Sequence, residues 1–250
     1  MARLKSALKL VGAVGGLVFY RTEHGDLVRA KGDISAKRVR TDPKYARTRQ
    51  ANAEFARQGK AVRLLRNAFF TSFRHARDIN MTGRMTREMV RIIHRDAVNL
   101  LGERKVMNEN AGLLEGFDFN ANAQFQKIFS ASYTSTVDRM AGEVLIHFPS
   151  FVPKHDMVAP KGASYVRIIS HVAAIDFEKN SFTENRQETG LMRLDADLTP
   201  EFNVRHEIAK KEVLPVIVAI GVAFYQVVNG NIYFLNNGTY NSLSIARVFV

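Results

Sequence analysis

The spacing of apolar positions changes near the middle of the chain. Between residues 44 and 101 apolar side chains recur every three or four positions, which is the period of an α-helix. From about Gly116 they alternate with polar side chains, which is the period of a β-strand. The pattern therefore predicts an α+β fold in which a helical part precedes a strand-rich part.

Two amphipathic helices are predicted, one from residue 44 to residue 73 or 77 and one over residues 84–101. Pro43 suits the first turn of the first helix, with Thr41 or Asp42 as its cap. At about 100° per residue, an apolar stripe is expected within roughly 40° of Phe55. That stripe comprises Ala51, Phe55, Val62, Phe69 and Phe73. A short loop joins the helices, so they form a helical hairpin.

The face that the second helix is expected to bury carries one acidic residue. Its members are Met85, Met89, Ile92, Asp96 and Leu100. The motif His94-Arg95-Asp96 spells the start of a kinase catalytic loop, but Leu101 stands where that motif needs Asn. We therefore interpret Asp96 as the partner of a neighbouring arginine.

A β-hairpin is predicted ahead of the helices, over residues 17–32. Two β-prone segments flank His24-Gly25-Asp26, which reads as the turn, and residues 33–43 form a connector. Because an isolated hairpin is marginally stable in water, it is expected to pack on another surface.

The strand-rich part is predicted to be an antiparallel, immunoglobulin-like β-sandwich. Asn229-Gly230 between two apolar segments is a strong hairpin signal. The cysteine pair and tryptophan of antibody domains are missing, so only the architecture is predicted. The strand segments are 132–137, 143–148, 165–177, 191–197, 203–208, 213–228, 232–235 and 243–250. The predicted domains are a basic N-terminal module, 1–110, and the sandwich, 111–250.

Positive charge is concentrated in the front of the chain. The net charge is +12, and residues 1–100 contain 22 Lys or Arg against 8 acidic residues. Residues 37–77 alone contain 12 against 2. Such an imbalance indicates an anionic partner, namely a nucleic acid, an anionic membrane surface or an acidic protein surface. The alternative is a solvated helical face without a special partner. The candidate contacts form rows on the two helices, namely Arg49, Lys60, Arg63, Arg74, Arg84, Arg87, Arg91 and Arg95.

No motif for catalysis, for a cofactor or for a metal is present. The chain has no cysteine and no phosphate-binding, dinucleotide or nucleophile-elbow motif. His147, His155 and Asp156 are close in sequence, but they lie among prolines and are interpreted as a solvated loop. The protein is therefore predicted not to be an enzyme, with no catalytic, cofactor-binding or metal-binding residues.

The front of the chain resembles a family of uncharacterised proteins found mostly in Bacteroidota. The resemblance covers roughly residues 12–100 and brings no known activity. It implies a glycine-rich hairpin and a basic helical segment ahead of a variable β-rich part. The residues that carry it are Gly15-Gly16-Leu17-Val18-Phe19-Tyr20-Arg21, Arg29-Ala30-Lys31-Gly32, Thr41-Asp42-Pro43, Ala46-Arg47-Thr48-Arg49, Asn52-Ala53-Glu54-Phe55 and Lys60-Ala61-Val62-Arg63-Leu64-Leu65-Arg66.

The sequence leaves two functions open. The first is a structural protein that self-assembles, as a subunit of a filament, appendage or virus-like particle, through its N-terminal module and its strand edges. The alternative is a nucleic-acid-binding protein that contacts phosphates through the helical hairpin. No apolar run is long enough for a transmembrane helix. The apolar run 10–20 lacks a clear cleavage site, so synthesis for the cytoplasm is expected, with release as part of an assembly left open.

Overall fold

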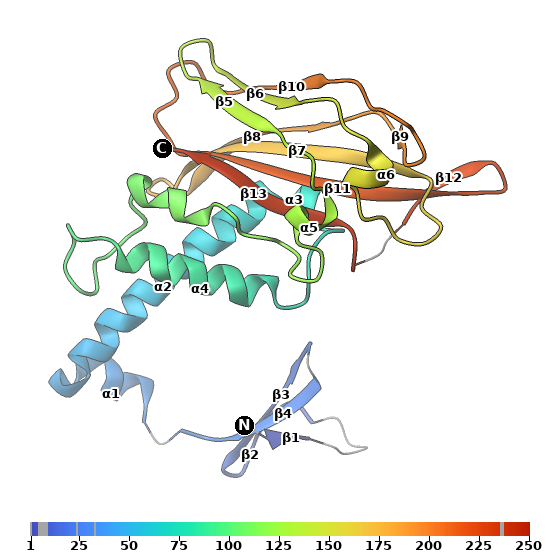
Figure 1. Ribbon diagram of the computed structural model, residues 1–250. Coiled ribbons are helices and arrows are strands. Elements are labelled where there is room, and N and C mark those ends of the chain that lie inside the picture. Colours follow the sequence, from blue (N-terminus) through green and yellow to red (C-terminus); the bar gives the residue numbers. More distant parts are fainter. Residues whose placement is uncertain (1, 5–9, 24, 33, 236–237) are drawn as a thin grey trace. The chain divides into compact units, whose positions relative to one another are not determined.

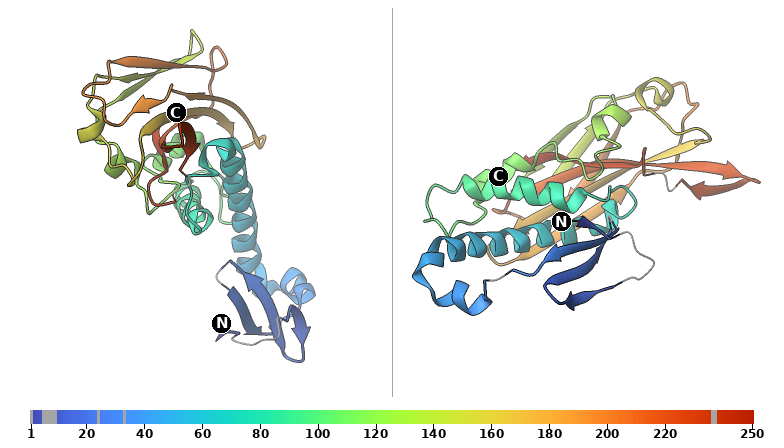
Figure 2. Two further views of the ribbon diagram at one scale, coloured as in Figure 1. Left: turned by 90° about the vertical axis from the view of Figure 1, so that its right-hand side faces the viewer. Right: turned by 90° about the horizontal axis from the view of Figure 1, so that it is seen from below.

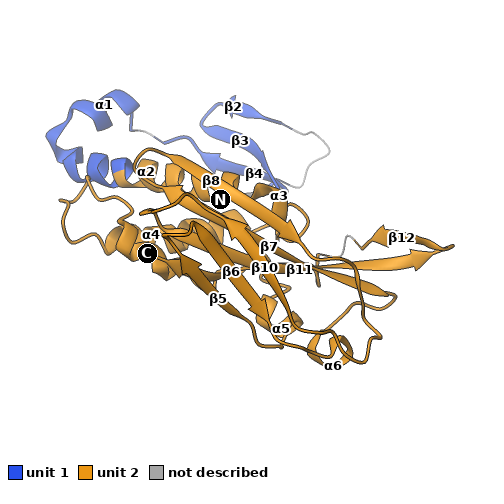
Figure 3. Cartoon of the chain, turned by 90° about the horizontal axis from the view of Figure 1, so that it is seen from above, with its two compact units in different colours: residues 1–53 blue, residues 54–250 orange. Residues whose placement is uncertain are grey.

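The chain divides into two units, residues 1–53 and 54–250 (Figure 3). The computed structural model describes residues 2–4, 10–23, 25–32, 34–235 and 238–250. The division differs from the predicted boundary near residue 110. The reason is that the second helix and most of the first pack in one hydrophobic core with the strands that follow them.

The first unit contains a four-stranded antiparallel sheet in the order β1-β4-β3-β2 (Figure 1). The predicted hairpin is the pair β3 (Leu17–Thr22) and β4 (Gly25–Ala30), with Leu17 opposite Ala30. His24, in the predicted turn, lies outside the described residues. The sequence did not predict the outer strands, β1 (Ala2–Arg3) and β2 (Gly12–Val14), because β1 has only two residues and three glycines interrupt the pattern at and after β2.

Part of the predicted connector is helical. The side chain of Ser35 accepts a hydrogen bond from Arg38 N–H at 3.2 Å and caps α1 (Ala36–Thr41). Asp42 then accepts from Lys44 N–H at 3.0 Å, and Pro43 stands in the first turn of the short 3₁₀ helix η1 (Pro43–Tyr45). Helix α2 (Ala46–Ala68) follows directly. The predicted start of the first helix, with Asp42 as cap and Pro43 in the first turn, is therefore confirmed.

The buried face of α2 differs from the predicted stripe. Phe55 is 65% exposed, whereas Glu54 and Gln58 are buried one turn apart. Both polar groups have partners, since Gly102 N–H donates to Glu54 Oε1 at 2.8 Å and Gln58 Nε2 donates to the Thr86 carbonyl at 3.0 Å. The stripe was therefore wrong in its first half, because hydrogen bonds satisfy two polar side chains on the packed face.

The second helix, α4, spans Met81–His94 and follows the single turn α3 (Phe70–Phe73). It ends earlier than predicted, and Leu100 is 76% exposed. Asp96, just beyond the helix, accepts hydrogen bonds from the backbone N–H groups of Val98, Asn99 and Lys105. These bonds hold the pKa of Asp96 well below its usual range, against the effect of burial. The predicted pairing of Asp96 with an arginine was therefore wrong.

The second unit contains two antiparallel sheets and several short helical turns. The six-stranded sheet comprises β7 (Tyr165–Asp176), β8 (Ser181–Glu188), β9 (Met192–Arg193), β11 (Val216–Val228), β12 (Asn231–Phe234) and β13 (Ser242–Phe249). The three-stranded sheet has the order β10-β6-β5, with β5 (Thr134–Asp138), β6 (Glu143–Phe148) and β10 (Phe202–Glu207). The turns are η2 (Asn108–Leu114), α5 (Phe125–Ile128) and α6 (Pro153–Asp156).

Two hydrophobic cores lie on opposite faces of the six-stranded sheet. Along β11, Ile217 and Ala219 belong to the core that includes α2 and α4, whereas Val216, Val218 and Ile220 belong to the core that includes the three-stranded sheet. Figures 1 and 2 show the helices on one side of the curled sheet and β5, β6 and β10 on the other. Burial on both faces explains why β11 is almost continuously apolar.

The structure confirms a fold of helices and antiparallel sheets. It does not confirm an immunoglobulin-like sandwich, because the six-stranded sheet is curled and carries helices on its second face. Most predicted strands are present, but the segment 191–197 is reduced to β9, and β8 was missed. The sequence of β8, SFTENRQE, is almost entirely polar and hides the strand.

Two glycines of β11 and its turn are required by the backbone. Asn229 and Gly230 have φ angles of 50° and 78°, so the predicted tight hairpin between β11 and β12 is confirmed. At Gly221 the neighbouring strand β13 approaches so closely that a Cβ atom would lie 2.1 Å from the carbonyl oxygen of Ser242. That distance leaves no room for a side chain.

We expect Gly221→Ala to lower the free energy of unfolding by about 3 kcal/mol, since β11 and β13 must separate to admit the methyl group. Gly59→Ala is the matched control, because nothing lies within 4 Å of its Cβ position on α2. This control is expected to raise the free energy of unfolding by about 1 kcal/mol. Urea unfolding of both variants measures the difference, and equal stability of Gly221→Ala and the parent would contradict the close approach.

Candidate functional site

Two of the eight predicted contact residues hold the structure together. Arg49 donates to the carbonyl oxygens of Val39 and Asp42, at 3.0 and 2.9 Å. Arg84 forms an ion pair with Asp78, and it also donates to the Asp118 carbonyl at 2.6 Å. Because both guanidinium groups are half-buried and have protein partners, neither is available to an anionic partner.

The other six predicted residues are exposed, and two of these have partners. Arg74 donates to His75 Nε2 at 2.7 Å, and Arg91 lies 3.1 Å from Glu88. Among the described residues, the side chains of the remaining four, Lys60, Arg63, Arg87 and Arg95, form no hydrogen bond or ion pair.

The structure brings two of these four free cations together. Lys60 and Arg63 line a hollow of about 400 Å³ with Asn67 of the same helix and with Asn180, which follows β7. Arg87 lines a different hollow, next to Arg84 and Glu88. An anion in the first hollow would meet two positive charges and two side-chain amides.

In the sheet of the first unit, no side chain of β2, β3 or β4 is buried. The same holds for residues 4, 10–23, 25–32 and 34–53. Leu10, Val11, Val14 and Leu17 are 42%, 73%, 61% and 45% exposed. Strands β1 and β2 are the outer strands of this sheet, and each pairs with one strand only in the described part of the chain. Small sheets need a hydrophobic face packed against another element, so the first unit lacks a source of stability that the second unit has on both faces of its large sheet.

The apolar run 10–20, which mimics a signal peptide in the sequence, supplies these exposed side chains. This apolar run is the feature of the sequence from which an exposed apolar surface could have been predicted. Its glycines hid the strand β2.

A chain of polar side chains runs through the core between α3 and the six-stranded sheet. Arg186 Nε donates to Ser72 Oγ at 3.0 Å, and Ser72 Oγ lies 2.7 Å from His171 Nδ1. With the serine hydroxyl donating to Nδ1, the ring hydrogen is on Nε2, which faces Glu184 Oε2 at 2.5 Å. Sequence reasoning missed this chain, because Ser72 and His171 are 99 positions apart.

A second histidine is buried next to the first. Ser170 Oγ lies 2.8 Å from His206 Nε2, and His206 Nδ1 lies 2.9 Å from the side-chain oxygen of Asn185. Burial lowers the pKa of His206 to about 4. Burial, helped by the charge of Arg186, lowers the pKa of His171 to about 3 even though Glu184 faces the ring. Both rings are therefore neutral near pH 7.

The residue types Ser72, His171 and Glu184 also occur in hydrolytic triads, but the geometry favours a structural role. The serine hydroxyl accepts a bond from Arg186, and the imidazole has a pKa too low for a general base near neutral pH. The polar chain instead joins α3, β7 and β8.

We expect stability to fall between about pH 6.5 and pH 4, because the two rings are neutral when folded and take up protons when unfolded. Each ring contributes up to about 1.4 kcal/mol per pH unit to the free energy of unfolding. His206→Gln is expected to reduce that slope, whereas His155→Gln, at an exposed position, is the control. Urea unfolding at several pH values measures how the free energy of unfolding of each variant changes with pH. An unchanged slope in His206→Gln would contradict the neutral buried ring.

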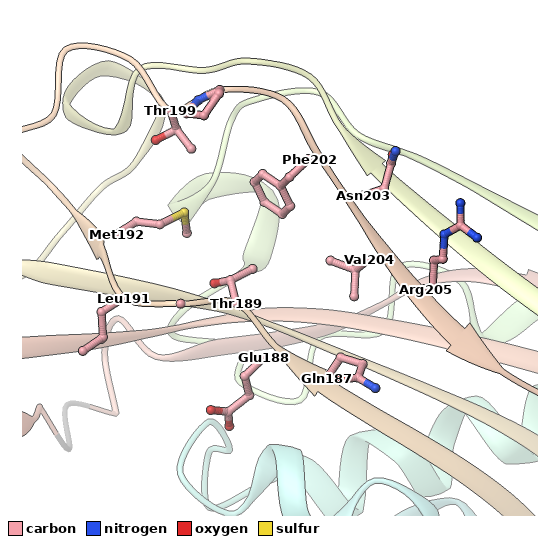
Figure 4. A pocket seen from close by; sticks show the side chains of 12 residues that line it. Gln187, Glu188, Thr189, Leu191, Met192, Thr199, Phe202, Asn203, Val204 and Arg205 are labelled. Atoms are coloured by element: carbon pink, nitrogen blue, oxygen red, sulfur yellow. The ribbon is translucent and has the colours of Figure 1, made fainter.

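A groove with a volume of about 620 Å³ lies between β8 and β10 in the second unit (Figure 4). Its walls combine the exposed ends of two strands with a loop. Apolar side chains from Leu191, Met192, Phe202 and Val204 line it, beside the polar side chains of Gln187 and Asn203. Strand β8 pairs with β7, and β10 pairs with β6, so each has one edge without a strand partner in the described part of the chain.

Neither a metal centre nor a spanning helix is found in the described parts. There, no group of three histidine or acidic side chains has the geometry to hold a metal ion. Also within these residues, no helix combines the length and the apolar character that crossing a membrane requires.

Comparisons with models of protein families, with curated proteins and with solved structures find no match to this chain. The likeness of the front of the chain to Bacteroidota proteins therefore remains a resemblance.

Proposed function

We propose that this chain is a non-enzymatic structural protein that self-assembles through its N-terminal sheet and its strand edges. The product is a homo-oligomer such as a filament, an appendage or a virus-like particle. The observation that carries the proposal is the four-stranded N-terminal sheet, in which no side chain of β2, β3 or β4 is buried. Other copies of the chain are present wherever the chain is made, so a second copy is the simplest partner for such a surface.

The energetics favour covering this sheet. Full burial of one valine or leucine side chain contributes about 1.5–3 kcal/mol. The exposed fractions of Leu10, Val11, Val14 and Leu17 range from 42% to 73%. A partner that covers these four side chains would therefore gain hydrophobic stabilisation at each of them. Open strand edges add unpaired N–H and C=O groups to the same surface, and these groups readily pair with another strand.

The proposal extends to the second unit. We interpret the three-stranded sheet and the six-stranded sheet as the two layers of an immunoglobulin-like sandwich, because they share one hydrophobic core. In this interpretation the sandwich is the rigid body of each subunit, and its strand edges supply the second assembly surface.

Replacing both Val11 and Val14 with threonine is expected to weaken assembly by roughly tenfold or more, because threonine keeps the β-branched shape but removes apolar area. The control is Val213→Thr, at a position that is 81% exposed in the second unit. Sedimentation velocity over a range of concentrations measures the change. If the double variant assembles as strongly as the parent, these two side chains are not covered.

Nucleic-acid binding is a second candidate function, supported by the hollow that Lys60 and Arg63 share. Both cations are exposed and unpaired within the described residues, and Asn67 and Asn180 beside them can donate to phosphate oxygens. Contacts of this kind neutralise phosphates without reading base sequence.

We expect Lys60→Gln with Arg63→Gln to weaken binding to duplex DNA and to reduce its logarithmic salt slope by about 1.8, if both side chains contact phosphates. The control pair, Arg193→Gln with Arg205→Gln, changes the net charge equally at another place in the fold. Fluorescence anisotropy over a salt series measures both the affinity and the salt slope. Equal effects of the two pairs of substitutions would exclude this hollow as the DNA-binding site.

A further inference from the structure

The groove between β8 and β10 has the features of a site for an added β-strand. Two strand edges border it, one from each sheet, and in an edge strand alternate N–H and C=O groups point away from the paired neighbour. The floor between them is apolar, with Met192, Phe202 and Val204 exposed to the groove. An extended segment can therefore bond to an edge by its backbone and place alternate side chains in the groove.

The surroundings of the groove carry excess negative charge. Residues 176–207 contain eight acidic residues and four Lys or Arg. Several of these charges pair with each other, such as Arg193 with Asp195. Asp197, Glu201 and Glu207 are exposed and form no ion pair within the described residues. These three carboxylates lie on the segment of chain that forms the groove, while the charged side chains that line the groove itself are Glu188 and Arg205.

The first unit has the complementary charge and a free edge. Residues 1–32 contain six Lys or Arg and two acidic residues. Strand β2 (Gly12–Val14) is the outer strand of its sheet and pairs with β3 alone among the described strands. Val11 and Val14 beside and within it are exposed, while Gly12 and Ala13 leave its backbone accessible to another strand.

We propose that the groove between β8 and β10 binds strand β2 of a second copy of this chain by β-strand addition. This inference rests on the proposed self-assembly and names its contact. Because β2 and the groove are different surfaces, each subunit offers one of each, and the contact is heterologous. Repetition of such a contact builds a ring or a filament rather than stopping at a dimer.

The absence of cysteine from the chain makes a clean cross-linking test possible. Full-length Val14→Cys protein is mixed with full-length Asn203→Cys protein, and a short bis-maleimide is added. The two variants carry tags of different mass, so mixed dimers are distinguished from dimers of one variant. Both positions are exposed, and the unfolding of each variant is checked against the parent.

The matched control replaces the Asn203→Cys protein with Thr136→Cys protein. Thr136 is exposed on β5, the other edge of the same three-stranded sheet. Mixed dimers are expected to form at least about tenfold faster with Asn203→Cys than with Thr136→Cys, because strand addition holds the thiols at a high effective concentration. Gln187→Cys, on β8, provides a second position in the groove and is expected to react like Asn203→Cys.

Sedimentation velocity on the unmodified chain separates the failure of this inference from the failure of self-assembly. If the chain assembles but cross-links equally to β5, or to neither edge, the groove is not the contact while self-assembly stands. If the chain stays monomeric at every concentration, both proposals fail. Assembly with selective cross-linking at the two groove positions supports both.

Discussion

Strand β11 determines how the second unit is built, because its side chains supply two cores at once. Alternate residues from Val216 onward pack toward the helices or toward the three-stranded sheet. A strand with both faces buried needs cover on both sides. Helices α2 and α4 provide one cover and β5, β6 and β10 the other, and the close approach at Gly221 fixes β13 against β11. The hydrogen bonds from Arg186 to Ser72 and between Ser72 and His171 add directional contacts to this packing.

The same requirement distinguishes the first unit. Its sheet contains β-prone side chains, including Val14, Leu17 and Val28, but no side chain of β2, β3 or β4 is buried. A sheet that satisfies its backbone without burying its side chains obtains little of the hydrophobic stabilisation that holds most folds together. Contact with further copies would supply that stabilisation, and the positive charge of this unit would favour the acidic surroundings of the groove between β8 and β10.

Sequence reasoning found the elements whose patterns are local. It placed the helical hairpin, the strand β6, the tight turn at Asn229-Gly230 and the cap at Asp42, because each is encoded in a few neighbouring residues. It missed β8, whose polar side chains are compatible with an edge, and it shifted the face of α2 because Glu54 and Gln58 find partners from distant segments.

The candidate site was predicted only in part for the same reason. A row of cations on a helix can be recognised in the sequence. That Arg49 and Arg84 donate to backbone carbonyl oxygens, and so are not available to a partner, depends on tertiary contacts. The Ser72–His171 pair and the groove likewise join residues far apart in the chain. The apolar segment at residues 10–20 could be recognised in the sequence, whereas its place in a β-sheet could not.

Hydrogen–deuterium exchange at two protein concentrations tests most directly whether further copies cover the N-terminal sheet. The account predicts that backbone amides of β2, β3 and β4 exchange more slowly at high concentration, because strand addition and burial protect them. Amides in the centre of β11, already covered on both faces, are expected to exchange at the same rate in both samples. Equal exchange of β2, β3 and β4 at the two concentrations would contradict the account.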